Sequence, residues 1–416
     1  MLQQLEGSRA VAETVARCRP EVVCAYPISP QTHIIEAIGA MVKDGRLAPC
    51  EFINVESEYA AMSVSIGASA AGARAYTATA SQGLLFMIEA VYNAAGLGLP
   101  VVMTLANRAI GAPINIWNDH SDAMAVRDAG WIQLFAETNQ EAADLHVQAF
   151  RLAETLSVPV MVCMDGFILT HAVEAVDLID QAVVDSFLPP YEPRQVLDPD
   201  DPVSIGAMVG PEAFEEVRYL AHLRQLDALE LIPSVAEEFA ALTGRASGGL
   251  LHPYRLDDAE TVIVAMGSVL GTIKDAVDAR RATGERVGVL GVTTFRPFPV
   301  AAVADALAGA RRVIVVEKAF SLGMGGVLAT DVATASPASG PELATVVAGL
   351  GGRPITRRDV EGVLGRSAQG TLPRLSFLNL DEDVVARERA RMAASRRSGP
   401  FAENVLRDLA AGGANR

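Results

Sequence analysis

One strand-to-helix unit decides the fold: EVVCAYPISPQTHIIEAIGAMVK, residues 21–43. Residues 21–27 form a short run rich in valine, and residues 31–43 carry apolar side chains at helical spacing. Between the two parts, Pro27 and Pro30 predict a tight turn that presents Ser29 at the end of the strand. The unit is therefore a buried strand followed by a helix, with a polar side chain at the junction.

The same alternation continues through the first half of the chain. We predict strands at 21–27, 51–55, 74–80, 100–106 and 159–165, and helices at 31–43, 57–71, 83–95 and 140–156. Apolar strands separated by helices are typical of a mostly parallel sheet that is covered on both faces. The expected class is α/β, with a doubly wound sheet in a first domain at residues 1–187.

Three further regions follow this domain. Five prolines lie between residues 188 and 202, which predicts an extended arm that either wraps a partner or links domains. A helical stretch at 213–242 follows, and we assign residues 188–249 to this arm and linker. Strands expected at 261–266, 286–290, 312–316 and 343–348 indicate a smaller doubly wound domain at 250–370. Residues 371–416 are expected to form a helical tail with a break at 398–400.

The composition excludes several classes of protein. The chain has 34 basic and 50 acidic residues, a net charge of −16, and therefore lacks the basic face that nucleic acid or an anionic membrane requires. Its four cysteines contain no C-x-x-C pair, which argues against a disulfide scaffold and against an iron–sulfur or zinc site built from this chain alone. The N-terminus does not read as a signal peptide and no spanning helix is expected, so we expect a cytoplasmic protein.

Polar residues that follow the predicted strands are the candidates for chemistry, because ligands of open α/β sheets bind beyond the carboxyl ends of the strands. Ser29 is either a presented hydroxyl or a plain helix cap, and Glu58 is either a catalytic or a capping carboxylate. Gly83 permits close approach of a ligand or belongs to an ordinary turn. Arg108 clamps a carboxylate or forms a structural ion pair. The helix that continues from Ala60 has no charged face and is expected to be buried all round.

Other patterns are weaker. The segment from Asp119 through His120 and Ser121 to Asp122 contains metal-ligating types, but no second histidine lies nearby, so we expect no metal site. Residues 267–271 read G-x-x-x-G and miss the dinucleotide fingerprint, which argues against a self-contained Rossmann-type binding protein.

Taken together, the loops resemble a known family. The chain is similar to the α subunit of thiamine-diphosphate-dependent 2-oxoacid:acceptor oxidoreductases, such as pyruvate:ferredoxin oxidoreductase and phenylglyoxylate dehydrogenase. The similarity covers roughly residues 1–370. It is carried by AYPISPQT at 25–32, VESE at 55–58, TATASQG at 77–83, ANR at 106–108, NDHSD at 118–122, VCMDGF at 162–167, RPFP at 296–299 and EK at 317–318.

This resemblance implies roles for individual residues. The first domain would be the pyrimidine-binding domain of a thiamine enzyme, in which Glu58 hydrogen-bonds the aminopyrimidine ring. Gln82 and Gly83 would also contact the cofactor. Arg108 would bind the carboxylate of the substrate, and Ser29, Thr32 and Asn107 would also contact the substrate. The expected catalytic residues are Glu58, Arg108 and Ser29. Many members have threonine where this chain has Ser29, which favours slightly a larger 2-oxo acid such as phenylglyoxylate over pyruvate.

The resemblance also implies partners. The chain lacks a G-D-G…N diphosphate-binding signature and cluster cysteines, so a β subunit would supply the diphosphate–Mg²⁺ site. The [4Fe–4S] clusters would lie on the β subunit and on a ferredoxin-like chain, within a complex that has γ- and δ-type subunits. Coenzyme A would accept the acyl group, and the electrons would pass to ferredoxin, or to NAD through an FAD subunit. The second domain resembles the transketolase C-terminal domain. A non-catalytic scaffold subunit is the competing interpretation, and it requires Glu58 to be dispensable.

Overall fold

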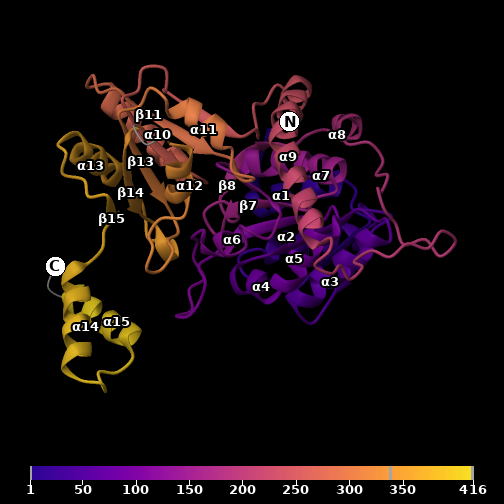
Figure 1. Cartoon of the computed structure of the whole chain (residues 1–416), viewed down its shortest axis with the longest axis horizontal. Helices are drawn as coiled ribbons and strands as arrows, with labels where there is room; N and C mark the ends of the chain where they lie inside the picture. The colour runs from indigo at the N-terminus through magenta and orange to yellow at the C-terminus, as the bar shows by residue number, and fades with distance from the viewer. Residues whose placement is uncertain (1, 337–339, 414–416) are drawn as a thin grey trace.

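The computed structural model describes residues 2–336 and 340–413, which form two α/β bodies and a pair of C-terminal helices (Figure 1). The first body contains a seven-stranded sheet with the order β12-β6-β7-β5-β4-β2-β3. Its strands are β2 (Val22–Ala25), β3 (Glu51–Asn54), β4 (Ala75–Thr79), β5 (Val102–Asn107), β6 (Ile132–Phe135), β7 (Val160–Asp165) and β12 (Thr294–Arg296). All neighbours pair in parallel except β12, which runs antiparallel to β6. The predicted fold class is confirmed.

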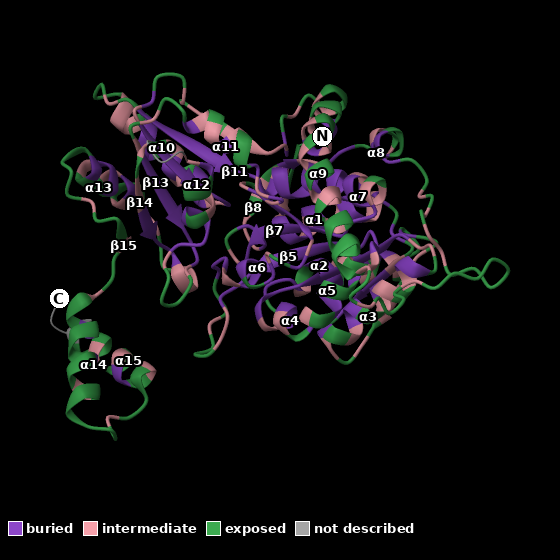
Figure 2. Cartoon of the chain, viewed as in Figure 1, coloured by how far each residue is buried: buried purple, intermediate pink, exposed green. Residues whose placement is uncertain are grey.

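Helices cover both faces of this sheet. One core joins the sheet to α1 (Gly7–Arg17), α2 (Thr32–Lys43), α7 (Asn139–Leu156) and α8 (Gln181–Phe187). The other face packs against α3 (Glu58–Ala70), α4 (Ser81–Phe86), α5 (Ile88–Leu97) and α6 (Ser121–Ala125). Strands β4, β5 and β7 are buried along their whole length, which is why they read as continuous apolar runs. Figure 2 shows the buried colour at the labelled strands β5 and β7. Beside the main sheet, β1 (Leu2–Glu6) pairs antiparallel with β8 (Val173–Asp177).

Two local expectations were wrong. The helix predicted at 83–95 is two helices, α4 and α5, which are separated at Met87. The helix that continues from Ala60 is not buried all round, because Ser63 and Gly67 on α3 are exposed. Absence of charge predicted burial, but within this chain only the face of α3 turned toward the sheet is covered.

The proline-rich arm lies against the first body before it turns outward. The backbone N–H of Leu197 donates to the Ala70 carbonyl, and the Gln195 side chain donates to the Leu97 carbonyl. The long helix α9 (Phe214–Thr243) then packs on the first core through Ala228, Ile232 and Phe239. No helix formed by the described residues combines the length and apolar character needed to cross a membrane.

The second body contains a six-stranded sheet with the order β15-β14-β13-β10-β11-β9. The strands are β9 (Leu251–Tyr254), β10 (Thr261–Ala265), β11 (Val287–Val292), β13 (Arg312–Glu317), β14 (Glu342–Val347) and β15 (Leu375–Phe377), of which only β9 is antiparallel. Its helices are α10 (Val269–Arg281), α11 (Val300–Leu307), α12 (Leu328–Ala335) and α13 (Arg357–Ala368), with a short 3-10 helix at Leu350–Gly352. Helices α14 (Glu382–Ala394) and α15 (Phe401–Gly413) form the tail (Figure 1).

The two bodies are not independent. Strand β12 leaves the second body and adds to the edge of the first sheet beside β6, where Phe295 meets Phe135 at a ring-centroid distance of 6.0 Å. One hydrophobic cluster also runs continuously from Met103 and Trp131 in the first body to Val264 in the second. This shared core fixes the position of the β6 side of the first sheet against the second body. The domain boundaries at 187, 249 and 370 stay predictions.

Candidate active site

The candidate residues lie at one edge of the first sheet. Strands β2, β3, β4 and β5 are parallel, so the turns that follow them meet at their carboxyl ends. Ser29 and Arg108 lie in those turns, and Glu58 and Gln82 lie at the starts of the helices that follow them. Gln31, which is fully buried, connects the end of β2 to strand β4 by donating from its amide to the carbonyls of Tyr26 and Ala78.

Glu58 is the first residue of α3 and only 8% exposed. The preceding Ser57 caps the helix by accepting the N–H of Ala60 at 3.2 Å. The positive end of the helix favours a negative charge at Glu58. Within the described chain, however, no donor hydrogen-bonds to its carboxylate. A carboxylate that is nearly removed from water and left without a donor has capacity to bind a ligand.

Gly83 determines the space beside this carboxylate. A Cβ atom at position 83 would lie 2.5 Å from the Thr79 hydroxyl oxygen and 2.8 Å from Oε1 of Glu58. Both distances are far inside van der Waals contact, so any larger residue would displace the Glu58 side chain. Glycine at this turn is therefore required by the position of Glu58.

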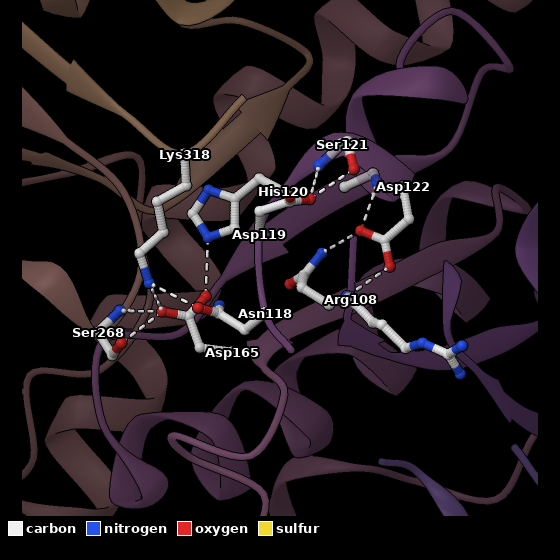
Figure 3. Close-up of polar contacts among 11 residues, drawn as sticks. Arg108, Asn118, Asp119, His120, Ser121, Asp122, Asp165, Ser268 and Lys318 are labelled. Atoms are coloured by element: carbon white, nitrogen blue, oxygen red, sulfur yellow. Dashed lines mark hydrogen bonds and ion pairs between the residues drawn. The ribbon is translucent and has the colours of Figure 1, made fainter. Parts of the chain in front are cut away.

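Arg108 is a buried cation without an anion. It is 7% exposed, and its Nη1 and Nε donate to the carbonyls of Ser29, at 2.9 Å, and Asn115, at 3.1 Å. Burial lowers the pKa of Arg108, although the charge of Asp122 opposes this. Figure 3 shows the guanidinium pointing away from Asp122, and no carboxylate of the described residues lies within 4 Å of it. The two carbonyls orient the guanidinium and leave its charge for a ligand.

Asp122, fully buried in α6, joins two of the strand-end turns. Its carboxylate accepts the backbone N–H groups of Ser81, at 3.0 Å, and Arg108, at 2.9 Å, and the side-chain amide of Asn107, also at 2.9 Å. Ser81 has a φ of +48°, a left-handed conformation that costs energy in a residue other than glycine. Burial raises the pKa of Asp122 to about 7 against the effect of these donors. Asp122 therefore holds Ser81 in a strained conformation and fixes the backbone of Arg108.

A second polar cluster connects the two bodies at the carboxyl end of β7, next to the end of β5 (Figure 3). Asp165, at the end of β7, pairs with Lys318 of the second body at 2.7 Å and with His120 at 2.7 Å, and it accepts the N–H and hydroxyl of Ser268. Burial alone would raise the pKa of Asp165, but the charges of Lys318 and His120 outweigh it and hold this pKa well below its usual range. The Lys318 ammonium also donates to Asn118 at 3.2 Å. The cluster is a buried ion-pair network that positions the loop from Asn118 to Asp122.

The structure brings only some of the expected residues into contact. Ser29 meets Arg108 through its carbonyl, while its hydroxyl is exposed and has no partner among the described residues. The Gln82 amide oxygen accepts the hydroxyl of Ser81. Thr32 is the first residue of α2 and makes no side-chain hydrogen bond within the described residues. The roles assigned to these residues stay predictions.

The side chains of the Asp119–Asp122 segment each have a different partner. His120 pairs with Asp165, Asp119 accepts from Ser121, and Asp122 accepts from backbone N–H groups, so the three side chains do not converge. Sequence reasoning gave no role to Asp122, Asp165 or Lys318. Two signals were available: all three residues lie in segments that carry the family resemblance, and Asp165 and Lys318 lie, like Arg108, at or directly after the end of an apolar strand.

Comparisons with known proteins identify the family. Residues 13–236 match the family described as pyruvate flavodoxin/ferredoxin oxidoreductase, thiamine diphosphate-binding, and residues 259–360 match pyruvate:ferredoxin oxidoreductase core domain II. The chain is 48% identical to pyruvate synthase subunit PorA of Methanosarcina barkeri, over 92% of this chain and 97% of that protein. It is 40% identical to ketoisovalerate oxidoreductase subunit VorA of Pyrococcus horikoshii, over 86% and 92%.

A solved structure supports the fold. The 2-oxoglutarate:ferredoxin oxidoreductase from Magnetococcus marinus superposes with a TM-score of 0.68 at 19% identity, over 88% of this chain. This chain spans 65% of the length of that chain. From the matching domains and the close relatives together, the chain belongs to the family of thiamine-diphosphate-dependent 2-oxoacid:ferredoxin oxidoreductases, as an α subunit.

Proposed function

We propose that this chain contributes the pyrimidine-facing glutamate, Glu58, and the carboxylate-binding arginine, Arg108, to an active site that converts pyruvate to acetyl-coenzyme A. The reaction consumes a 2-oxo acid and coenzyme A and yields the acyl thioester, carbon dioxide, a proton and two electrons. The electrons leave through partner subunits, and the reaction takes place in the cytoplasm.

The observation that carries the proposal is a pair of buried charged side chains, each without a partner of opposite charge in the described part of the chain, at the carboxyl ends of the strands of the first sheet. Glu58 lacks a donor and Arg108 lacks a carboxylate among the described residues, although both are less than a tenth exposed. Burying a charge without a partner is costly, so a fold retains it where a ligand supplies the partner. A cofactor with a ring nitrogen to accept or share a proton fits Glu58, and a 2-oxo acid fits Arg108.

The residues present fit thiamine diphosphate. Glu58 would hydrogen-bond the aminopyrimidine ring through its carboxylate. Because Gly83 has no side chain, it leaves room for that carboxylate in its present position. Gln82 would lie at the same turn. When bound, the cofactor supplies the nucleophilic carbon and takes up the electrons released by decarboxylation. Arg108 would orient the substrate carboxylate with its planar fork, and Ser29 and Thr32 would border the 2-oxo group.

The electron path requires other chains. The four cysteines do not gather at one point, because the group of three metal-ligand side chains found among the described residues, Glu6, His33 and His171, contains no cysteine. We therefore place the [4Fe–4S] clusters and the diphosphate–Mg²⁺ site on β-, γ- and δ-type subunits, with coenzyme A as acyl acceptor. Ferredoxin, or a flavin subunit that reduces NAD, would receive the electrons.

The substrate proposal departs from the first expectation. The preference for an aromatic acid such as phenylglyoxylate rested on Ser29 alone. The relatives are named for pyruvate and for ketoisovalerate, which are both aliphatic, and the PorA protein is the more similar of the two. We therefore propose pyruvate as the substrate.

The test is a substrate panel on the purified complex. Pyruvate, 2-oxoisovalerate and phenylglyoxylate are each assayed with coenzyme A and an artificial electron acceptor, and pyruvate is expected to give the highest kcat/KM. Arg108→Gln is expected to raise KM for pyruvate by at least about tenfold, because it removes a charge-assisted contact. The matched control is Arg357→Gln, since Arg357 is an exposed arginine on α13. A preference for phenylglyoxylate, or an unchanged KM in Arg108→Gln, would contradict the proposal.

A further inference from the structure

Three side chains of metal-binding type converge at the surface where the N-terminal strand meets α2. Glu6 ends β1, His33 lies in the first turn of α2, and His171 lies in the loop between β7 and β8. One ligand atom from each residue lies within 4.8 Å of the ligand atoms of the other two. The three residues come from separate segments of the chain, so no local sequence pattern indicates this site.

The fold fixes two of the three positions through the backbone. Strands β1 and β8 pair so that Glu6 lies opposite Val173, two residues beyond His171. The next residue, Gly7, donates its N–H to the carbonyl of Ala172 at 3.0 Å. Glu6 and His171 are therefore held beside each other by the two-stranded sheet, and α2 brings His33 to them.

The side chains are also oriented toward one another. The rings of His33 and His171 lie 4.7 Å apart between centroids and are tilted by 35°. Nδ1 of His33 lies 2.6 Å from Oε1 of Glu6, and the hydroxyl of Thr170 lies 2.7 Å from Nδ1 of His171. A hydrogen bond to one nitrogen of a histidine ring fixes the ring and its tautomer, as is common next to metal ligands.

A simple ion pair accounts for only part of this arrangement. The His33 and Glu6 side chains are 50% and 31% exposed, and exposed ion pairs of this kind contribute little to stability. Such a pair does not require the ring of His171, from a third segment, to face the same point. Two imidazoles and one carboxylate are, by contrast, a ligand set that zinc accepts, with a fourth position left open.

We propose that Glu6, His33 and His171 form a surface site for a divalent transition metal, of which Zn²⁺ is the best match. Ligands around a tetrahedral ion with bonds of about 2.1 Å lie about 3.4 Å apart, so small side-chain rotations close the site. The bound ion ties β1, the β7–β8 loop and α2 together. Since α2 begins directly after the loop that carries Ser29, the ion stabilises one wall of the candidate active site.

The test is calorimetric titration of the full chain with zinc chloride in the absence of substrate, so its outcome does not depend on the proposed function. One saturable site per chain is expected. His33→Ala and His171→Ala are each expected to weaken binding by at least about tenfold. His222→Ala is the matched control, because His222 is an exposed histidine on α9 whose ring meets only Tyr219 among the described rings. Cys50→Ser is a second control, because Cys50 is the one cysteine that is not fully buried.

Thermal unfolding gives an independent measurement. Zinc is expected to raise the Tm of the unmodified chain and of His222→Ala, and to leave that of His33→Ala unchanged. His33 and Glu6 lie at the surface, so their substitution leaves the core intact, and circular dichroism verifies folding. The proposal is overturned if no saturable site is found, or if His33→Ala and His171→Ala bind zinc as tightly as His222→Ala.

Discussion

Replacing Lys318 by methionine tests how strongly the two bodies are held together. The Lys318 ammonium lies 2.7 Å from Asp165, and the two side chains are 4% and 0% exposed. Lys318→Met keeps the length of the side chain but leaves the Asp165 carboxylate buried with only His120 and Ser268 as partners. Removing one member of a buried pair costs up to about 3–5 kcal/mol, because the remaining carboxylate loses its Lys318 counter-ion and keeps only His120 and Ser268.

Urea unfolding, followed by circular dichroism, measures this loss against a matched control. Arg19→Met breaks the pair between Arg19 and Asp185, which has a similar distance of 2.8 Å but side chains that are 60% and 40% exposed. The control is expected to cost at most about 1 kcal/mol. The double variant Asp165→Asn with Lys318→Met is expected to regain part of the loss, since it removes the uncompensated charge. The reasoning is refuted if Lys318→Met costs no more than Arg19→Met.

Two further predictions concern the sheet edge. Gly83→Ala is expected to weaken thiamine diphosphate binding by the assembled complex, because the new Cβ would overlap Thr79 and Glu58. The control is Gly362→Ala on α13, where a Cβ meets nothing within 4 Å, and this variant is expected to bind the cofactor with normal affinity. Equal affinities of the two variants would contradict the prediction. Asp122 has a pKa raised to about 7, so the native state keeps a proton that the unfolded chain releases near pH 4. The free energy of unfolding should therefore fall, relative to Asp122→Asn, as the pH rises from about 4 to about 7, and urea titrations that show a constant difference would refute this.

The sequence predicted the central strands well because burial on both faces leaves a continuous apolar run. Strands β4, β5 and β7 show this pattern and were located within a few residues. Strand β6, at Ile132–Phe135, was not predicted. Strand β12 was also missed, since its three residues acquire their partner from β6, far earlier in the chain.

The candidate site shows the same division between local and distant information. Glu58 and Arg108 were found because each follows a predicted strand, and the rule for strand ends applies within a short segment. Asp122 was not assigned, because its partner Ser81 lies 41 residues earlier. The pairing of Asp165 with Lys318 spans 153 residues and depends on how the second body docks. No local sequence pattern predicts contacts between residues so far apart in the chain.

One face of α3 carries small, uncharged residues and is exposed in the single chain. Ser63 and Gly67 leave that face small and uncharged, and it remains uncovered in the single chain. A surface that allows close approach of another backbone suits an α subunit, whose relatives are named as subunits.

The measurement that tests the account most directly is the turnover of pyruvate by the intact complex that carries Glu58→Gln. The substitution keeps the size of the side chain and removes its charge. Loss of at least about a hundredfold in kcat is expected, as for removal of a proton-handling group, with the complex still assembled. Glu56→Gln, at the exposed glutamate two residues earlier, is the control and should retain full activity. Full activity of Glu58→Gln would contradict the account and favour a scaffold subunit.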